Sequence, residues 1–428
     1  MDRFRFLHAA DIHLDSPLQR LERYEGAPVD EIRLASRQAL KNLVSLAIEQ
    51  RVAFVLIAGD LYDGDWKDFH TGLFFVSQMA QLRDANVPVI VIKGNHDAAN
   101  KMTRQLSLPD NVHMLDHERP QTVTLDDLGV AIHGQSFAQR AVTDDLSKNY
   151  PVAISGLLNV GVLHTCAGGR ESHDAYAPCT IDGLRSKNYD YWALGHIHKP
   201  EVLSTDPYII FPGNIQGRHI GELGVRGCVL VDVEDGRIVQ TIDQPLDVFR
   251  WQRCWVDAAG AKNSDDLLER VRQSIEPLLA EAEHRSLVVR VELAGACQAH
   301  REIAARPEQW VNEVRAVGIS LGQQVWIEKV QTATTLPLDL AEAMDMDSPQ
   351  GELARFIEEL KADPGQIPLL LGKKLGELRN KLPSELRGDS TEANEKLPGS
   401  VAASALLDQV QHMLIERLSA TADVEDRI

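Results

Sequence analysis

The sequence predicts a layered α/β protein with a smaller α/β domain behind it. Three observations support this class. Apolar runs without alternation, at 52–58 and 87–92, are typical of strands covered on both faces. Amphipathic stretches with helical spacing lie between these runs, and the runs end in turns that contain Gly, Asn or Asp. A chain of 428 residues is long enough for two or three domains of about 100–200 residues each.

The first domain is expected at residues 1–245, where strands and helices alternate. A helix from about residue 30 is indicated by the apolar residues Ile32, Leu40, Leu43, Leu46 and Ala47. A further helix is predicted at 68–85. The predicted strands are 4–11, 52–60, 87–97, 159–165, 189–198, 208–214 and 227–233. This alternation is typical of one layered α/β domain.

A smaller domain is expected at 248–332, after a break near Gln244–Arg250. Its predicted strand, helix, strand, helix and strand occupy 249–258, 263–282, 286–295, 299–317 and 323–332. An appended α/β unit of about 85 residues is a common size for such a module.

Residues 340–428 are expected to form a helical C-terminal region. An amphipathic helix is predicted at 348–361 with Ser348 as its N-cap, and 368–390 is interrupted by Pro383 and Gly388. A second helix at 400–419 carries the apolar stripe Val401, Leu406, Val410, Met413, Leu414 and Leu418. Such a stripe either packs onto its own protein or docks a partner, and its spacing is the same in both cases.

The composition argues against several classes of protein. A hydrophobic fraction of 44% and a charged fraction of 25% are ordinary for a globular protein and exclude global disorder. No apolar run approaches the roughly 18 residues of a membrane helix, and Asp11 interrupts any N-terminal signal sequence. Five widely spaced cysteines without a C-x-x-C pair argue against disulfides and zinc–thiolate sites, and we expect a cytoplasmic protein.

Five predicted strands end in residue types that bind metals. Asp11-x-His13, Gly59-Asp60-x-x-Asp63, Gly94-Asn95-His96-Asp97, His164 and Gly195-His196-x-His198 follow one another along the chain. Because the carboxyl ends of strands in an open α/β sheet share one crevice, we expect these turns to converge. Ligands of the Asp, Asn and His type without thiolate suit Mn²⁺, Fe²⁺ or Zn²⁺.

The number of these ligands indicates two metal ions. The seven donors are Asp11, His13, Asp60, Asn95, His164, His196 and His198. They are too many for one ion with open positions, and they fit two ions that share a bridging carboxylate. Two ions about 3.5–4 Å apart can bind a phosphoryl oxygen and a hydroxide, which predicts metal-assisted hydrolysis of a phosphoester. The other histidines at 8, 70, 113, 133 and 173 are expected to be ordinary core or surface residues.

The order D-x-H, G-D-x-x-D, G-N-H-D, H and G-H-x-H resembles the calcineurin-like metallophosphoesterases over residues 4–233. GDLYD, GNHD and the trailing small domain resemble the SbcD-type DNA-repair nuclease subunits. DIHLDSPL and PGNIQGRHIGE (212–222) resemble the bacterial YhaO branch of these exonucleases. The resemblance implies a four-layer β-sandwich flanked by helices, dependence on Mn²⁺ and cleavage of DNA phosphodiesters.

The resemblance also implies a role for each site residue. One ion would bind Asp11, His13, Asp60 and His198, and the other Asp60, Asn95, His164 and His196. His96 would act on the scissile phosphate or its leaving oxygen, and Asp97 would orient His96. Asp63 would orient a ligand or a water, or cap its turn. Apart from the resemblance, Arg218 and His219 are expected to contact substrate phosphate because Arg suits bidentate phosphate contact, although a surface salt bridge is the alternative for Arg218.

Other activities remain open at this level. A phosphoprotein phosphatase carries G-D-x-x-D-R-G and G-N-H-E, whereas this chain has Gly64 and Asp97 at the differing positions. A cyclic-nucleotide or other small-molecule phosphodiesterase uses the same ligands. A non-catalytic scaffold with a vestigial metal site is a third alternative, against which the complete ligand set argues.

The expected partners are DNA and an ATPase. GQIPLLLGKK (365–374) lacks the spacing of a P-loop, so the chain has no predicted ATP site of its own. The resemblance implies an SMC-like coiled-coil ATPase of the YhaN or SbcC type, docked on 348–361 and 400–419, and a homodimer. A net charge of -19 argues against strong DNA binding by the chain alone, although two bound divalent ions would add about four positive charges at the site.

Overall fold

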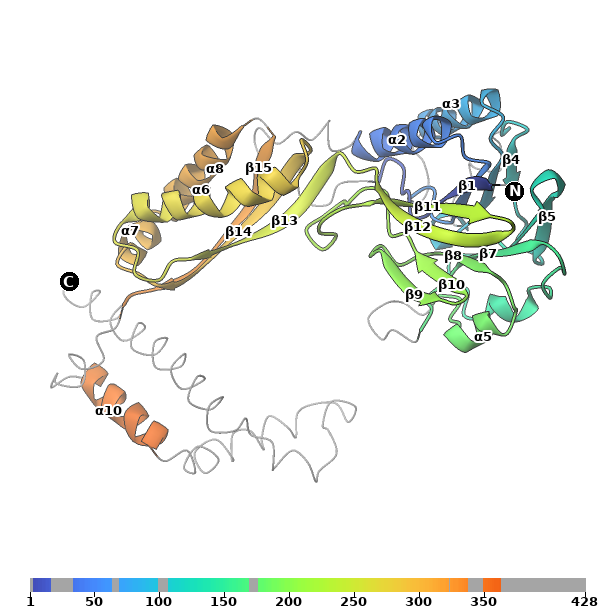
Figure 1. Ribbon diagram of the computed structural model, residues 1–428. Coiled ribbons are helices and arrows are strands. Elements are labelled where there is room, and N and C mark those ends of the chain that lie inside the picture. The colour runs from blue at the N-terminus through green and yellow to red at the C-terminus, as the bar shows by residue number, and fades with distance from the viewer. Residues whose placement is uncertain are drawn as a thin grey trace. The chain divides into compact units, whose positions relative to one another are not determined.

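The computed structural model describes residues 3–16, 34–63, 69–98, 107–168, 176–322, 324–337 and 349–362. The chain forms two compact units (Figure 1). Of the described residues, those within 1–253, 276–290 and 318–329 belong to the first unit, and those within 254–275, 291–317 and from 330 onward belong to the second. In these described ranges no helix is long and apolar enough to cross a membrane.

Six strands form the first sheet, in the order β12-β11-β1-β2-β3-β4. The parallel strands are β1 (Arg3–Ala9), β2 (Phe54–Ala58), β3 (Val89–Ile92) and β4 (Val112–Met114). The antiparallel edge consists of β11 (Gly227–Glu234), which pairs with β1, and β12 (Arg237–Pro245). Every residue of β2 and β3 is buried, as expected for apolar runs without alternation.

Six strands also form the second sheet, in the order β5-β6-β7-β8-β10-β9. The parallel strands are β6 (Val130–Gly134), β7 (Leu158–His164), β8 (Tyr191–Gly195) and β10 (Tyr208–Phe211). The edges are antiparallel and consist of β5 (Gln121–Leu125) and β9 (Glu201–Thr205). A short helix η3 (Asp126–Leu128) joins β5 to β6.

The two sheets pack face to face through an apolar core. Phe6, Phe54, Ile90, Val160 and Tyr191 are among its fully buried residues. The Phe6 and Phe54 rings stack with centroids 4.7 Å apart. Burial of large aromatic side chains at about 25 cal/mol per Å² makes this layer a major source of stability.

Helices cover the outer faces of both sheets. The first sheet packs against α2 (Ala35–Glu49) and α3 (His70–Asp84) through a cluster that includes Leu40, Leu43, Phe75 and Met79. The second sheet packs through Trp192 and Phe211 against Leu184 of α5 (Ile181–Arg185), near the short helix η4 (Leu146–Asn149). The order helix, sheet, sheet, helix confirms the predicted four-layer sandwich flanked by helices.

Several elements differ from the sequence-based prediction. The first helix begins at Ala35 in the described chain, and Ile32 lies outside the described residues. Strands β4, β5, β6, β9 and β12 were not predicted. Strands β4, β5, β9 and β12 are edge strands with few buried residues, so no apolar run marks them in the sequence.

A three-stranded sheet follows, in the order β13-β14-β15. Its strands are β13 (Phe249–Asp257), β14 (Ser286–Ala296) and β15 (Val325–Thr335). Helix α6 (Ser264–Glu281) joins the first two strands close to its predicted place, with Leu267, Val271 and Ile275 buried. The next predicted helix, 299–317, is two helices, α7 (His300–Ala305) and α8 (Pro307–Leu321), because a proline favours a helix start over a helix interior.

Helix α10 (Pro349–Ala362) confirms the helix expected at 348–361. Its apolar stripe, which includes Ala354, Ile357 and Leu360, is buried, whereas Phe356 is 47% exposed. Ser348, the segment 365–390 and the helix predicted at 400–419 lie outside the described residues. All five cysteines are buried free thiols.

Candidate metal centre

The predicted metal ligands come from strand ends of both sheets. In the first sheet, Asp11 and His13 follow β1, Asp60 follows β2, and Asn95 begins the short helix α4 (Asn95–Ala98) after β3. In the second sheet, His164 ends β7, and His196 and His198 follow β8. Five of the seven are buried, while His196 and His198 are half-buried.

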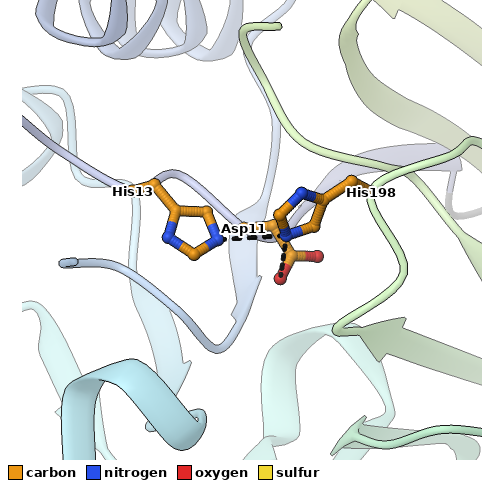
Figure 2. A group of neighbouring side chains, drawn as sticks. All are labelled: Asp11, His13 and His198. Carbon is orange, nitrogen blue, oxygen red and sulfur yellow. Dashed lines mark hydrogen bonds and ion pairs between the residues drawn. The ribbon is translucent and has the colours of Figure 1, made fainter. Parts of the chain in front are cut away.

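Asp11, His13 and His198 form one group whose ligand atoms lie within 4.8 Å of one another. Figure 2 shows the two imidazole rings turned toward each other beside the carboxylate of Asp11. The Nε2 atoms of His13 and His198 are 3.1 Å apart, and Asp11 Oδ1 is 3.9 Å from His198 Nε2. Asp60 Oδ2 lies 3.8 Å from His13 Nε2, so Asp60 adjoins this group.

Asp60, His164 and His196 form a second group within the same distance limit. His164 Nε2 lies 3.4 Å from Asp60 Oδ2 and 2.9 Å from Asn95 Oδ1. The structure therefore brings all seven predicted ligands together, with Asp60 in reach of both groups.

The hydrogen bonds of two histidines test whether cations fit these groups. His164 Nδ1 must donate to the carbonyl of Ala58 at 2.9 Å, so Nε2 of the neutral ring presents a lone pair to the oxygens of Asp60 and Asn95. His198 Nδ1 donates in the same way to the carboxylate of Glu222 at 2.6 Å, and its Nε2 faces His13. Acceptors that face one another need a proton or a cation between them. The donor set of nitrogen and oxygen atoms therefore fits divalent ions such as Mn²⁺, Fe²⁺ or Zn²⁺.

The protonation equilibria of the group show where positive charge is favoured. Burial alone would lower the pKa of His164, but the carboxylates of Asp60 and Asp11 outweigh burial and raise the pKa to about 9. Burial also raises the pKa of Asp11 to about 6 and lowers the pKa of His13 well below its usual value. In the metal-free group a proton on His164 therefore takes the place that a divalent cation would fill.

Four predicted ligands have left-handed backbone conformations. The φ angles are +50° at Asp11, +45° at His13, +49° at Asp60 and +100° at His196. Such angles are uncommon outside glycine and cost on the order of 1–3 kcal/mol each. Hydrogen bonds hold them: the backbone N–H of His196 donates to both carboxylate oxygens of Asp11, at 3.1 and 3.0 Å. Four of the twelve described non-glycine residues with positive φ are therefore predicted ligands, and backbone strain at such positions is a common mark of a functional site.

Two motif glycines leave room for the ligands. A Cβ atom at Gly59 would overlap the ring of His164, and one at Gly94 would overlap the carboxylate of Asp60. The glycines of G-D-x-x-D and G-N-H-D are therefore required by close packing between the two groups.

His96 lies beside the groups and pairs with Asp63. The distance from His96 Nδ1 to Asp63 Oδ1 is 2.7 Å, and Ser16 donates to the other oxygen of Asp63 at 2.6 Å. The hydrogen bond to Asp63 raises the pKa of His96. Burial would raise the pKa of Asp63, but the hydrogen bonds from His96 and Ser16 lower it to about 2. Asp63 is therefore an anion that favours the protonated form of His96 and fixes its orientation.

The expectation that Asp97 orients His96 differs from the structure. Asp97 is buried and accepts hydrogen bonds from the backbone N–H groups of Leu61, Tyr62 and Gly94, at 3.1, 2.8 and 3.0 Å. These bonds tie the loop after β2 to the loop after β3. Asp63 takes the role expected of Asp97, because the backbone occupies both oxygens of Asp97.

Arg218 faces the site and is only 20% exposed, so it does not form an ordinary surface salt bridge. Its guanidinium lies 3.5 Å from Asp63 Oδ2 and 3.2 Å from Glu222 Oε1. His219 is 55% exposed, and its Nε2 lies 3.5 Å from Glu222 Oε1. Substrate contact by these two residues stays a prediction.

Glu222 was not among the predicted site residues. Its buried carboxylate accepts hydrogen bonds from His198 Nδ1, from Asn214 Nδ2 at 2.9 Å and from the backbone N–H of Arg218 at 2.7 Å. Burial opposes its ionisation, but His198 and Arg218 keep its pKa well below the usual range. The sequence offered only one sign of this residue, its position four residues after Arg218. That segment had been considered as a phosphate-binding segment because of the Arg218 guanidinium and the His219 imidazole.

Four of the five histidines that were expected to be ordinary core or surface residues are described by the structure. His8 contacts the hydroxyl of Tyr191 at 3.0 Å and the carbonyl of Leu194 at 3.1 Å. His133 contacts Thr122 and Asn159. The histidines at 70 and 113 are exposed, and residue 173 lies outside the described residues.

Comparison with known proteins gives two matching family models. The model of the calcineurin-like phosphoesterase matches residues 4–200, and the model of the middle domain of the metallophosphoesterase YhaO matches residues 251–335. Over 277 residues the chain is 35% identical to the metallophosphoesterase YhaO of Bacillus subtilis. The aligned region covers 64% of this chain and 68% of that protein.

Weaker similarities are found to a repair protein and to a solved structure. Over 300 residues the chain is 24% identical to the DNA double-strand break repair protein Mre11 of Methanopyrus kandleri, covering 63% of this chain and 62% of that protein. A dimetal phosphatase from Danio rerio matches with a TM-score of 0.33 and 14% identity, covering 56% of this chain and 98% of that chain.

Proposed function

The chain belongs to the calcineurin-like metallophosphoesterases, and from that premise we propose that it is a DNA nuclease that hydrolyses phosphodiester bonds. One observation carries the proposal: Asp60 belongs to the group with His164 and His196, lies 3.8 Å from His13 of the group with Asp11 and His198, and has the His96–Asp63 pair beside it. A site with two ions, of which Mn²⁺ is the expected one, would polarise the phosphoryl group and lower the pKa of a water.

Asp60 and His96 have separate roles in the proposed reaction. Asp60 would bridge the two ions and hold the His96 backbone N–H at 2.9 Å, which couples the position of His96 to the metal centre. His96, whose protonated form Asp63 favours, would stabilise charge on the scissile phosphate and donate a proton to the leaving oxygen. General-acid catalysis of this kind contributes typically 10²- to 10⁴-fold.

DNA is the proposed substrate class for two reasons. The Mre11 relatives of Methanopyrus and Sulfurisphaera are double-strand break repair proteins, and they match this chain across half or more of their length. Arg218 also places a guanidinium between Asp63 and Glu222 at the site, where it can pair with a phosphate oxygen. We therefore assign the chain to DNA repair as an exonuclease.

A small-molecule phosphodiesterase is the second candidate. The cavity at the site has a volume of about 660 Å³, which is enough for a cyclic nucleotide. A phosphoprotein phosphatase is disfavoured by the sequence at residues 64 and 97, although Gly64 lies outside the described residues.

A direct assay separates these candidates. The full-length protein, supplied with Mn²⁺, is offered labelled linear DNA, a cyclic dinucleotide and a phosphopeptide in parallel. We expect cleavage of the DNA and little turnover of the other two. Hydrolysis of the cyclic dinucleotide alone would replace the nuclease assignment with the second candidate.

A coiled-coil ATPase of the SMC-like type is the proposed partner, and α10 is part of its proposed docking region. Only the exposed side of α10 is available, because its main apolar stripe is buried. Phe356→Asp in the full chain should therefore reduce co-purification with such an ATPase, whereas Ile319→Asp, at an exposed position on α8, should not. Equal recovery of the ATPase by both variants would remove α10 from the interface.

A further inference from the structure

The cavity beside the metal ligands has a positively charged lining in a strongly acidic protein. Arg140, Lys199, Arg218 and Arg226 line it, together with the two carboxylates of Asp60 and Glu222. The whole chain carries a net charge of -19, so the net positive charge of this cavity lining is opposite in sign to the charge of the molecule. Such a lining favours an anionic ligand even before metal ions are bound.

Two of these cations already have partners in the fold, although Arg218 also faces the metal groups, where the proposed function has it pair with the reacting phosphate. Arg218 pairs with Glu222 and Asp63. Arg226 is buried, and its guanidinium donates to the carbonyls of His198 and Leu223. Both side chains contact His198: Arg218 at the ring nitrogen Nδ1 and Arg226 at the backbone carbonyl.

The other two cations are available to a ligand. Arg140, in the loop after β6, and Lys199, directly after His198, are both exposed. Among the described residues neither has a hydrogen bond or an ion pair. Phosphates that flank the reacting one carry the charge that such side chains bind.

An aromatic ring completes this part of the lining. Tyr176 is half-buried, and its ring lies at 89° to the ring of His196 with the centroids 5.5 Å apart. A flat ring beside a predicted metal ligand is suited to stacking on a nucleobase next to the reacting phosphate. Cations that follow the strand and aromatic rings that stack on bases are the usual components of single-strand binding sites.

The size of the cavity limits what can enter. A volume of about 660 Å³ is in the range of pockets for small ligands and holds a nucleotide with its flanking phosphates. A paired nucleotide would bring the opposite strand with it. A base must therefore leave its partner before it can reach Tyr176.

We propose that Arg140, Lys199 and Tyr176 form a subsite for an unpaired nucleotide beside the scissile phosphate. The inference rests on the proposed DNA nuclease activity and adds a specificity: the strand is cleaved where it is single-stranded. The two cations bind the flanking phosphates, and Tyr176 stacks on the base.

The test compares two DNA duplexes that differ only at their ends. One is closed by G·C pairs, and the other has the same sequence with a short unpaired stretch at each end. We expect the Mn²⁺-supplied wild-type protein to cleave the unpaired ends at least about tenfold faster in kcat/KM. Equal rates on the two duplexes would overturn the proposal.

Variants of Arg140, Lys199 and Tyr176 test whether these residues cause the faster cleavage of unpaired ends. Arg140→Ala with Lys199→Ala should lower kcat/KM on the unpaired ends at least tenfold and reduce the slope of log KM against log salt by about 0.7 per lost phosphate contact. Tyr176→Ala should cost roughly 5- to 100-fold, whereas Tyr176→Phe, which keeps the ring, should stay near wild type. Arg119→Ala, an exposed cation outside the cavity, is the matched control for charge. Cavity variants that behave like Arg119→Ala would also overturn the proposal.

Bis(p-nitrophenyl) phosphate separates this inference from the function on which it rests. This diester has no nucleobase and no flanking phosphate, so its hydrolysis reports the metal centre. Wild-type protein that hydrolyses it and cleaves neither duplex would contradict the nuclease assignment itself. Cleavage of both duplexes, with no effect of the cavity variants, would contradict the subsite alone.

Discussion

The two six-stranded sheets contribute different chemistry to the candidate metal centre. Both carboxylates in the ligand set, Asp11 and Asp60, follow strands of the first sheet. Three of the four imidazoles follow strands of the second sheet, at His164, His196 and His198. The first sheet thus supplies the negative charge that attracts cations, and the second supplies most of the neutral ligands.

The difference shows why the centre depends on the packing between the sheets. Neither sheet alone has a ligand set for two ions, and the two sets meet only because an apolar layer holds the strand ends together. Hydrogen bonds cross this boundary at the centre, from the backbone of His196 to Asp11 and from the ring of His164 to the carbonyl of Ala58. Variants in either sheet should therefore have different and predictable effects.

The largest effect is expected at Asp60, the carboxylate of the first sheet that belongs to one group and lies 3.8 Å from His13 of the other. Asp60→Ala should lower hydrolysis by on the order of a thousandfold or more and reduce the bound metal, because a bridging ligand of both ions is lost. Asp127→Ala, which removes an exposed carboxylate from η3, is the control. Activity close to the control's would remove Asp60 from the centre.

His96, also on the first sheet, separates catalysis from metal binding. His96→Gln should reduce kcat by about 10²- to 10⁴-fold while the metal content, measured by elemental analysis, stays at the wild-type level. A parallel fall in metal content would mean that His96 is a ligand. Asp63→Asn should reproduce part of the effect, because the pair with Asp63 raises the pKa of His96.

Glu222 tests the contribution of the second sheet. Glu222→Ala removes the acceptor that fixes the ring of His198, and metal affinity should fall about 10- to 100-fold in a calorimetric titration. Glu222→Gln retains an oxygen for the Nδ1–H of His198 and should lose less. If both variants bound Mn²⁺ as tightly as wild type, the orientation of His198 would not depend on this carboxylate.

The smallest effect concerns stability at the boundary between the sheets. Burial lowers the pKa of His8 from about 6.5 to about 3, so the folded state keeps this ring neutral while the unfolded state protonates it below pH 6.5. The contribution of the neutral His8 ring to the free energy of unfolding is complete above pH 6.5. It is lost as the pH falls from about 6.5 toward about 3. Between pH 7 and pH 5 the free energy of unfolding should fall by roughly 2 kcal/mol more in wild type than in His8→Leu. Equal pH dependence in denaturant titrations would show that His8 is not the responsible group.

The sequence predicted much of this arrangement because the strand-end motifs are local. Each combines a buried strand with a Gly turn and a ligand, so Asp60 or Asn95 could be located without knowledge of the tertiary structure. The convergence of the five turns also followed from the rule that ligands bind at the carboxyl ends of strands, although that rule concerns one sheet and the ligands come from two. Edge strands such as β5 and β12 were missed because they lack buried faces.

What the sequence could not supply depends on contacts between distant residues. The choice between Asp63 and Asp97 as the partner of His96 is decided by three backbone N–H groups that occupy Asp97. Glu222 became recognisable only when it was found against His198, on a different loop. The left-handed conformations at the ligands are likewise held by tertiary hydrogen bonds, since positive φ angles are uncommon even for Asp and His, which are enriched there among non-glycine residues.

The central claim is that ligands from both sheets form one centre for two ions joined by Asp60. The most direct test is the number of Mn²⁺ ions bound per chain, measured on the full-length wild-type protein and on Asp60→Asn. We predict about two ions per wild-type chain and a clear loss in the variant. One ion or none in the wild type, or an unchanged number in Asp60→Asn, would contradict the account.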